Sequence, residues 1–261
     1  MVKHIVMDAS GGKNIRFPES ALAHKWCVGK GAEFGSASHN PWNLPDCINI
    51  APQDDFALYQ AAQVELCGMY CQVDIWGEAE NVPLLDNSLD YVISSHVVEH
   101  LPDPIRAFKE WTRLLRDGGI VYMVVPLRDA LPADKDRPLS TVDEILKAHE
   151  NGVTVDTWNY ETNPVPGNRR GHYFVWEIGT MKEVINRAGL SWELMAEEPR
   201  DTKVGNGFAL VFKVSKPPQP EPTQEHTIET KDFASGGFVS EPPAIIREAM
   251  AKKTRSKSKQ A

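Results

Sequence analysis

The chain has 261 residues, of which 41% are hydrophobic and 25% charged, with a formal net charge of -8 at pH 7. This balance is ordinary for a globular protein and argues against a general nucleic-acid-binding surface. The longest apolar run, residues 120–126, is too short to span a bilayer, and the weakly apolar N-terminus shows no secretory signal. We therefore expect a cytoplasmic protein with no membrane span, no nucleic-acid partner and reduced cysteines.

Strand and helix patterns alternate along most of the chain. Pro104 is typical of the first position of a helix, and apolar residues at helical spacing follow it as far as Gly118-Gly119, which we expect to end the helix. A second helix is expected over 177–188. Strands separated by helices imply a largely parallel sheet with right-handed crossovers. The predicted strands span residues 31–35, 46–50, 70–75, 89–94, 120–125, 190–196 and 208–214.

Composition divides the chain into three parts. We expect an N-terminal extension over 1–24, a domain over 25–215 and a disordered tail over 216–261, because that proline-rich, polar segment cannot bury enough apolar surface to fold. Residues 127–175 interrupt the alternation and are too long for a simple connection. They are predicted to form an inserted substrate lid with a helix near 141–149, the alternative being a surface excursion with its own small core.

Two segments carry the residues expected to bind a ligand. The stretch from Asp86 to Pro104 runs from a turn into an apolar strand, ends in small and polar residues, and opens into a helix. Ligands of α/β proteins bind at such strand ends. The earlier loop after Gly35 holds only small residues at 36–38, so that a ligand could lie against its backbone.

Residues 25–127 resemble the cofactor-binding half of class I S-adenosylmethionine-dependent methyltransferases of the type 11 kind. The resemblance implies an α/β fold with a Rossmann-like, doubly wound, seven-stranded sheet that is mostly parallel and has an antiparallel C-terminal strand. It implies S-adenosyl-L-methionine as cofactor, with the loop at Gly35 around its methionine part and Asp74 capping its adenine. The residues so implied to bind the cofactor are Glu33, Gly35, Ser36, Ala37, Asp74, Ser94, Ser95 and His96.

The chain departs from the family pattern in two places. Ala37 and Ser38 replace glycines of the first loop, and Ala51 stands where an acidic residue usually accepts both ribose hydroxyls. Asn49, Asp54 or Asp55 are the alternatives for that contact. Losing it costs about 1.5–3 kcal/mol, which corresponds to roughly ten- to hundredfold in affinity.

A rival pattern overlaps the strand end. Residues 96–100 fit the H-x-x-E-H motif of inverted zinc peptidases, which needs both histidines on one helix. The preceding strand, together with Pro102 and Pro104, leaves little room for that helix and disfavours zinc hydrolysis. A divalent ion at Glu99 and His100 and purely local hydrogen bonding are the remaining alternatives, and no metal is assigned.

The sequence thus predicts a methyltransferase that acts on a small polar molecule at a hydroxyl by in-line transfer. A neutral histidine could remove the hydroxyl proton. His96 is the first candidate, with His172 and His149 of the insertion as alternatives, and an anionic or amine acceptor would need no base. The competing hypothesis is a non-catalytic binding or scaffold protein on the same fold, for which Ala51 is the main support.

Overall fold

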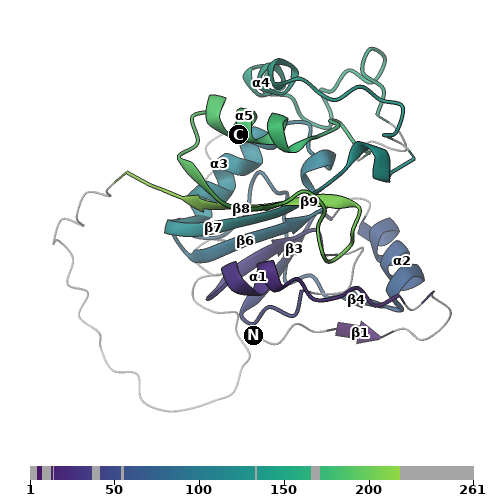
Figure 1. Ribbon diagram of the computed structural model, residues 1–261, viewed down its shortest axis with the longest axis vertical. Coiled ribbons are helices and arrows are strands. Elements are labelled where there is room, and N and C mark those ends of the chain that lie inside the picture. The colour runs from purple at the N-terminus through teal and green to yellow at the C-terminus, as the bar shows by residue number, and fades with distance from the viewer. Residues whose placement is uncertain are drawn as a thin grey trace, which may run out of the picture.

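The computed structural model describes residues 5–7, 13, 15–36, 42–53, 56–132, 134–165 and 171–217. A seven-stranded sheet of order β5-β3-β2-β6-β7-β9-β8 dominates it (Figure 1). Neighbouring strands pair in parallel from β5 to β7, whereas β9 is antiparallel to both of its neighbours. The expected fold class is confirmed. The strands are β2 (Gly31–Phe34), β3 (Cys47–Ala51), β5 (Ile75–Trp76), β6 (Leu89–Ser95), β7 (Leu115–Pro126), β8 (Trp192–Glu198) and β9 (Gly207–Val214).

Helices cover both faces of this sheet. Figure 1 shows α3 (Pro104–Leu114) and α5 (Ile178–Arg187) on one side and α1 (Ala21–Trp26) on the other. The apolar stripe of α3 packs on the first face, where Phe34 stacks on Trp111 with ring centroids 5.4 Å apart. Ala23 of α1 packs on the opposite face with Tyr91. Burial on both sides explains why the central strands read as continuous apolar runs.

The expected domain start at residue 25 is too late. It falls inside α1, whose Ala23 is fully buried in the core, so the domain includes this helix. The expected helix end at Gly118-Gly119 is also wrong, because α3 stops at Leu114. The two glycines lie in β7, where Gly118 has φ 73° and a Cβ on Gly119 would lie 2.9 Å from a backbone oxygen.

The predicted strand 70–75 divides into two. After α2 (Phe56–Cys67), β4 (Met69–Cys71) pairs with β1 (Ile5–Met7) in a separate antiparallel sheet, and only β5 joins the main sheet. Asp74 comes before β5, where its carboxylate accepts a hydrogen bond from the backbone N–H of Asn49 at 2.8 Å. The placement of Asp74 after the third strand is therefore wrong, and this side chain extends the pairing of the sheet edge.

Residues 127–175 form a segment between β7 and α5 that packs on the main core. It contains η2 (Arg128–Ala130) and α4 (Val142–Glu150), which contacts both α3 and α5. A capping box between Thr141 and Glu144 starts α4, and Ile145 is fully buried in the core. The described residues of the segment therefore share the main core rather than forming one of their own.

The expected tail lies almost wholly outside the described residues, which end at 217. Within the described ranges, no helix is both long and apolar enough to cross a membrane.

Candidate active site

The loop after β2 and the turn after β6 meet at the carboxyl edge of the sheet. Phe34 pairs with Ser94, which brings Gly35 beside the end of β6. The Gly35 N–H donates to Ile50 O of β3 at 3.0 Å, and a Cβ on Gly35 would lie 2.5 Å from Cγ2 of Val97. The two segments expected to share a ligand are thus in contact, although the space beside Gly35 is filled by Val97 rather than left open.

Several polar groups at this edge are buried, and two hydroxyls among them make no hydrogen bond with the described residues. The side chain of Ser94 is inaccessible and that of Ser95 is 8% exposed, and neither hydroxyl has a hydrogen-bond partner among the described residues. A buried hydroxyl without a partner costs about 1–3 kcal/mol, so these two groups are candidates for hydrogen bonds to a ligand. Ser36 and Glu33 are also buried nearby on β2 and its loop, whereas Ala37 lies outside the described residues.

His96 forms a strained turn directly after β6. Its φ of 56° is in the left-handed region, and its backbone N–H donates to Val124 O at 3.0 Å. Strain of this kind in a non-glycine residue is concentrated at functional sites. The turn directs the ring toward Glu99, so that Nδ1 lies 3.4 Å from Oε1 of that carboxylate.

Glu99 is the buried anion of the site. It lies in the short helix η1 (Val98–His100) and is completely inaccessible to solvent. Burial alone would raise the pKa of Glu99, but His96, His100 and His172 together lower the pKa to about 2. The carboxylate is therefore charged at neutral pH and holds three imidazoles around it.

His172 reaches this edge from the 127–175 segment. Its ring lies edge to face with that of His100, with centroids 4.8 Å apart, and its Nδ1 hydrogen-bonds Asp134. Burial lowers the pKa of His172, but Asp134 and Glu99 more than offset this and raise it above its ordinary value. The Tyr173 N–H donates to Glu99 O at 2.8 Å, which fixes the segment against η1.

His149 has a different role. Its Nδ1 lies 2.9 Å from Asp103 Oδ1 and its Nε2 lies 2.7 Å from Lys109 Nζ, so both ring nitrogens are engaged between α4 and α3. This arrangement locks the two helices together and gives no support to His149 as a base. Of the three histidines proposed from sequence, only His96 and His172 gather around Glu99.

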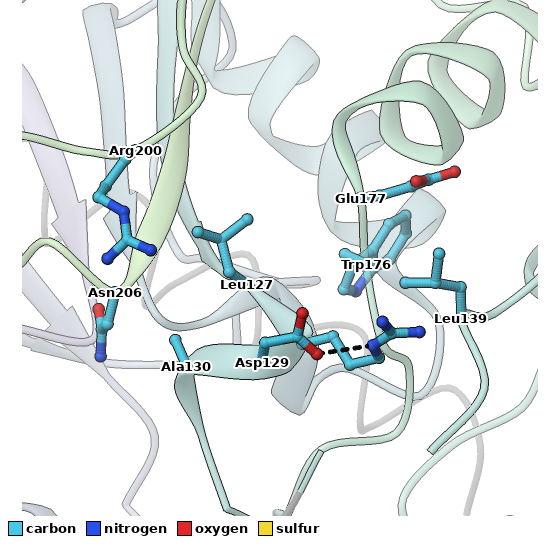
Figure 2. A pocket seen from close by; sticks show the side chains of 9 residues that line it. Leu127, Asp129, Ala130, Leu139, Trp176, Glu177, Arg200 and Asn206 are labelled. Atoms are coloured by element: carbon cyan, nitrogen blue, oxygen red, sulfur yellow. Dashed lines mark hydrogen bonds and ion pairs between the residues drawn. The ribbon is translucent and has the colours of Figure 1, made fainter. Parts of the chain in front are cut away.

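A pocket of about 480 Å³ opens at the carboxyl end of β7, one strand away from β6 (Figure 2). Figure 2 shows Arg200 and Asn206 on one side of it and Trp176 and Glu177 on the other. Trp176 Nε1 and Asn206 Oδ1 are buried with no hydrogen-bond partner within the described part of the chain. The sequence prediction missed this site; only its position beyond a strand end could have indicated it, because its walls come from distant segments.

The strand order, the antiparallel β9 and the polar edge after β2 and β6 together define the class I S-adenosylmethionine-dependent methyltransferase fold. Residues 52–123 match the family described as "Methyltransferase domain". The match to this family, together with similar methyltransferases among known proteins, confirms the resemblance drawn from the sequence motifs.

Known methyltransferases are similar in sequence to part of this chain. A probable S-adenosylmethionine-dependent methyltransferase of Mycolicibacterium smegmatis is 34% identical over 110 residues, which is 41% of this chain and 43% of that protein. A demethylmenaquinone methyltransferase of Staphylococcus epidermidis is 38% identical over 61 residues, 23% of this chain and 25% of that protein. The chain thus spans less than half the length of these curated relatives.

A solved structure from Thermotoga maritima, described as a methyltransferase and possible histamine N-methyltransferase, has a TM-score of 0.43 and 19% identity. The likeness covers 75% of this chain and 86% of that one. It is too distant to bear on activity.

The family implies S-adenosylmethionine as cofactor, and the edge fits it in part. The buried hydroxyls of Ser94 and Ser95 offer hydrogen bonds to a polar ligand. Ala51, however, ends β3 with a buried methyl group and provides nothing for a ribose diol, while Asp54 and Asp55 lie outside the described residues. Glu78 is the first carboxylate after β5 and is partly exposed.

Proposed function

We propose that this protein transfers a methyl group from S-adenosylmethionine to a hydroxyl of a small polar molecule. The observation that carries the proposal is the meeting of the β2 loop with the strained His96 turn. Beside it lie buried hydroxyls with no hydrogen-bond partner among the described residues, in a chain that matches the methyltransferase-domain family over residues 52–123. The cofactor supplies an electrophilic sulfonium methyl. The protein then has to orient the acceptor and exclude water.

The pocket beyond β7 is the proposed acceptor site. It combines the aromatic Trp176 with cationic Arg200 and anionic Asp129 and Glu177, and it lies on the same edge of the sheet as His96. Concave sites with an aromatic wall and a few polar groups suit small ligands. Mixed charges and unsatisfied polar atoms favour an acceptor with several hydrogen-bonding groups, and the 127–175 segment, which supplies one wall, is the proposed lid.

His96 is the proposed general base. Glu99 Oε1 faces its Nδ1, so the carboxylate favours the tautomer in which Nδ1 carries the proton and Nε2 can accept one. A positioned base typically contributes about 10²–10⁴-fold to the rate. His172 is the second candidate, although its Nδ1 is already engaged with Asp134.

The alternative of a non-catalytic binding or scaffold protein is favoured by one observation, the methyl group of Ala51 at the usual ribose position. We place the protein in the cytoplasm, a proposal supported by its four buried cysteines, none of which forms a disulfide in the described structure.

The test combines cofactor binding with turnover. We expect calorimetry on the full chain to detect S-adenosylhomocysteine binding, and a labelled-methyl screen against a metabolite extract to give a product identified by mass. His96→Ala should bind the cofactor within about twofold of wild type yet lose about 10²–10⁴-fold in turnover. His24→Ala, a histidine on α1 beside Glu19, is the matched control and should behave as wild type.

Two outcomes would count against this proposal. No binding at millimolar cofactor would favour the scaffold alternative, and unchanged turnover of His96→Ala would remove that residue from the role of base.

A further inference from the structure

Three metal-binding side chains converge where η1 meets the 127–175 segment. One ligand atom from each of Glu99, His100 and His172 lies within 4.8 Å of the other two. His100 Nε2 is 3.8 Å from Glu99 Oε1, and the two imidazole rings meet edge to face. This set differs from the H-x-x-E-H motif: η1 is a single short turn, and the second histidine comes from a distant segment rather than from His96.

The buried carboxylate of Glu99 at the centre of this cluster is independent evidence for a bound cation. Glu99 is 0% exposed, and neither of its oxygens makes a hydrogen bond with any residue that the structure describes. A buried carboxylate without hydrogen bonds is costly unless a cation is bonded to it. The neighbouring imidazoles face it at ion-pair distances, which are too long for strong hydrogen bonds.

The surroundings of His172 resemble those of a metal-binding histidine. Its Nδ1 is hydrogen-bonded to Asp134, which in turn accepts from Arg137 Nη1 at 2.7 Å. Histidine ligands commonly donate their other ring N–H to a carboxylate in this way, which fixes the ring and its tautomer. Nε2 of His172 is thereby left as the atom that can bind a metal.

We propose that Glu99, His100 and His172 bind a divalent transition-metal ion that ties the 127–175 segment to the carboxyl edge of the sheet. Two imidazoles and one carboxylate suit Zn²⁺, Fe²⁺ or Co²⁺ better than Mg²⁺ or Ca²⁺, which prefer oxygen ligands. Bonds of about 2.1 Å place tetrahedral ligands about 3.4 Å apart, so small side-chain rotations close the site. Three protein ligands leave a position for water, as in catalytic zinc sites. This proposal stands on the geometry of the cluster and does not depend on methyl transfer.

The test measures metal binding directly on the full chain. After removal of metals with a chelator, we expect the protein to take up about one equivalent of Co²⁺ with the visible absorption bands of a low-coordinate site, and added Zn²⁺ to displace it. Zn²⁺ in excess should also raise Tm by several degrees, because it binds only the folded chain.

Variants locate the site. His172→Ala and His100→Ala should each weaken binding by about a hundredfold or more, and Asp134→Asn by about ten- to hundredfold, because it only orients His172. His24→Ala should bind as wild type. Glu99→Gln is informative where circular dichroism shows a native fold, and the two histidine variants keep the test decisive if it does not fold.

Two results would overturn the inference. The first is uptake by the wild type of well under one equivalent of Co²⁺ and Zn²⁺ at micromolar concentration. The second is equal binding by wild type, His100→Ala and His172→Ala, which would place the metal elsewhere. Neither readout involves S-adenosylmethionine, so failure of the metal site and failure of the proposed methyl transfer can be told apart.

Discussion

Gly35 allows the loop after β2 and the turn after β6 to pack together because it has no side chain. Its φ of 70° is unfavourable for any residue with a Cβ, and the position of that atom is already occupied by Val97. The sequence predicts a glycine that leaves room for a ligand. The structure shows a glycine that lets the β6 turn approach the β2 loop, which holds both at the edge where the proposed cofactor would lie.

Gly35→Ala should therefore lower the stability of the protein by more than backbone strain alone would. We expect a loss of about 2–4 kcal/mol in the free energy of unfolding, from the left-handed φ and the 2.5 Å approach to Val97 Cγ2. Gly189→Ala is the matched control and should cost about 1 kcal/mol. Gly189 has φ 68°, but no atom of the described residues lies within 4 Å of the point that a Cβ would occupy. Urea denaturation measures both, and equal losses would show that the contact with Val97 is unimportant.

At the scale of elements, the strands with long apolar patterns were predictable and the short edge strand was not. Residues 120–125 and 208–214 read as strands because they are buried on both faces. β5 has only two residues, Ile75 and Trp76, so no periodicity can reveal it, and Asp74 was misplaced for that reason. The assembly of His172 with Glu99 depends on how the 127–175 segment folds back, which local sequence does not encode.

The junction between α3 and α4 depends on one buried carboxylate. Asp103 is 0% exposed and caps α3 by accepting from the Arg106 N–H at 3.0 Å. The same side chain pairs with the Arg106 guanidinium at 3.0 Å and with His149 of α4 at 2.9 Å. A single residue thus starts one helix and positions the next, and through α4 it supports the 127–175 segment.

Asp103→Ala should accordingly destabilise the protein strongly. Loss of the cap costs about 1 kcal/mol, and two cationic or polar partners lose their acceptor, so we expect about 2–4 kcal/mol in total. Asp103→Asn keeps a good capping group and should cost about half as much. Chemical denaturation followed by circular dichroism distinguishes the two variants. A loss below about 0.5 kcal/mol for Asp103→Ala would refute this account of the junction.

At the scale of the whole molecule, the residues just after β9 anchor the end of that strand to other parts of the domain. The Ser215 N–H donates to Ser191 O at 2.8 Å, and the Lys216 N–H donates to Asp117 Oδ1 at 2.8 Å. Lys216 Nζ reaches Asn87 Oδ1 at 2.5 Å and Arg113 O at 3.2 Å. These contacts join the end of β9 to the start of β7 and to the turn before β6, which makes Lys216 part of the domain rather than the first residue of a tail.

Two truncations separate these contacts from the rest of the C-terminal segment. A chain ending at 217 should melt within about 1 °C of full length, because the composition after that point predicts no buried core. A chain ending at 214 loses several hydrogen bonds worth about 1 kcal/mol each and should melt about 4–8 °C lower. Calorimetry of the three chains makes the comparison. If the chain ending at 217 melted as low as the chain ending at 214, residues beyond 217 would contribute to the fold and the predicted disorder would be wrong. If all three chains had the same Tm, the proposal that the contacts of Lys216 stabilise the domain would be wrong instead.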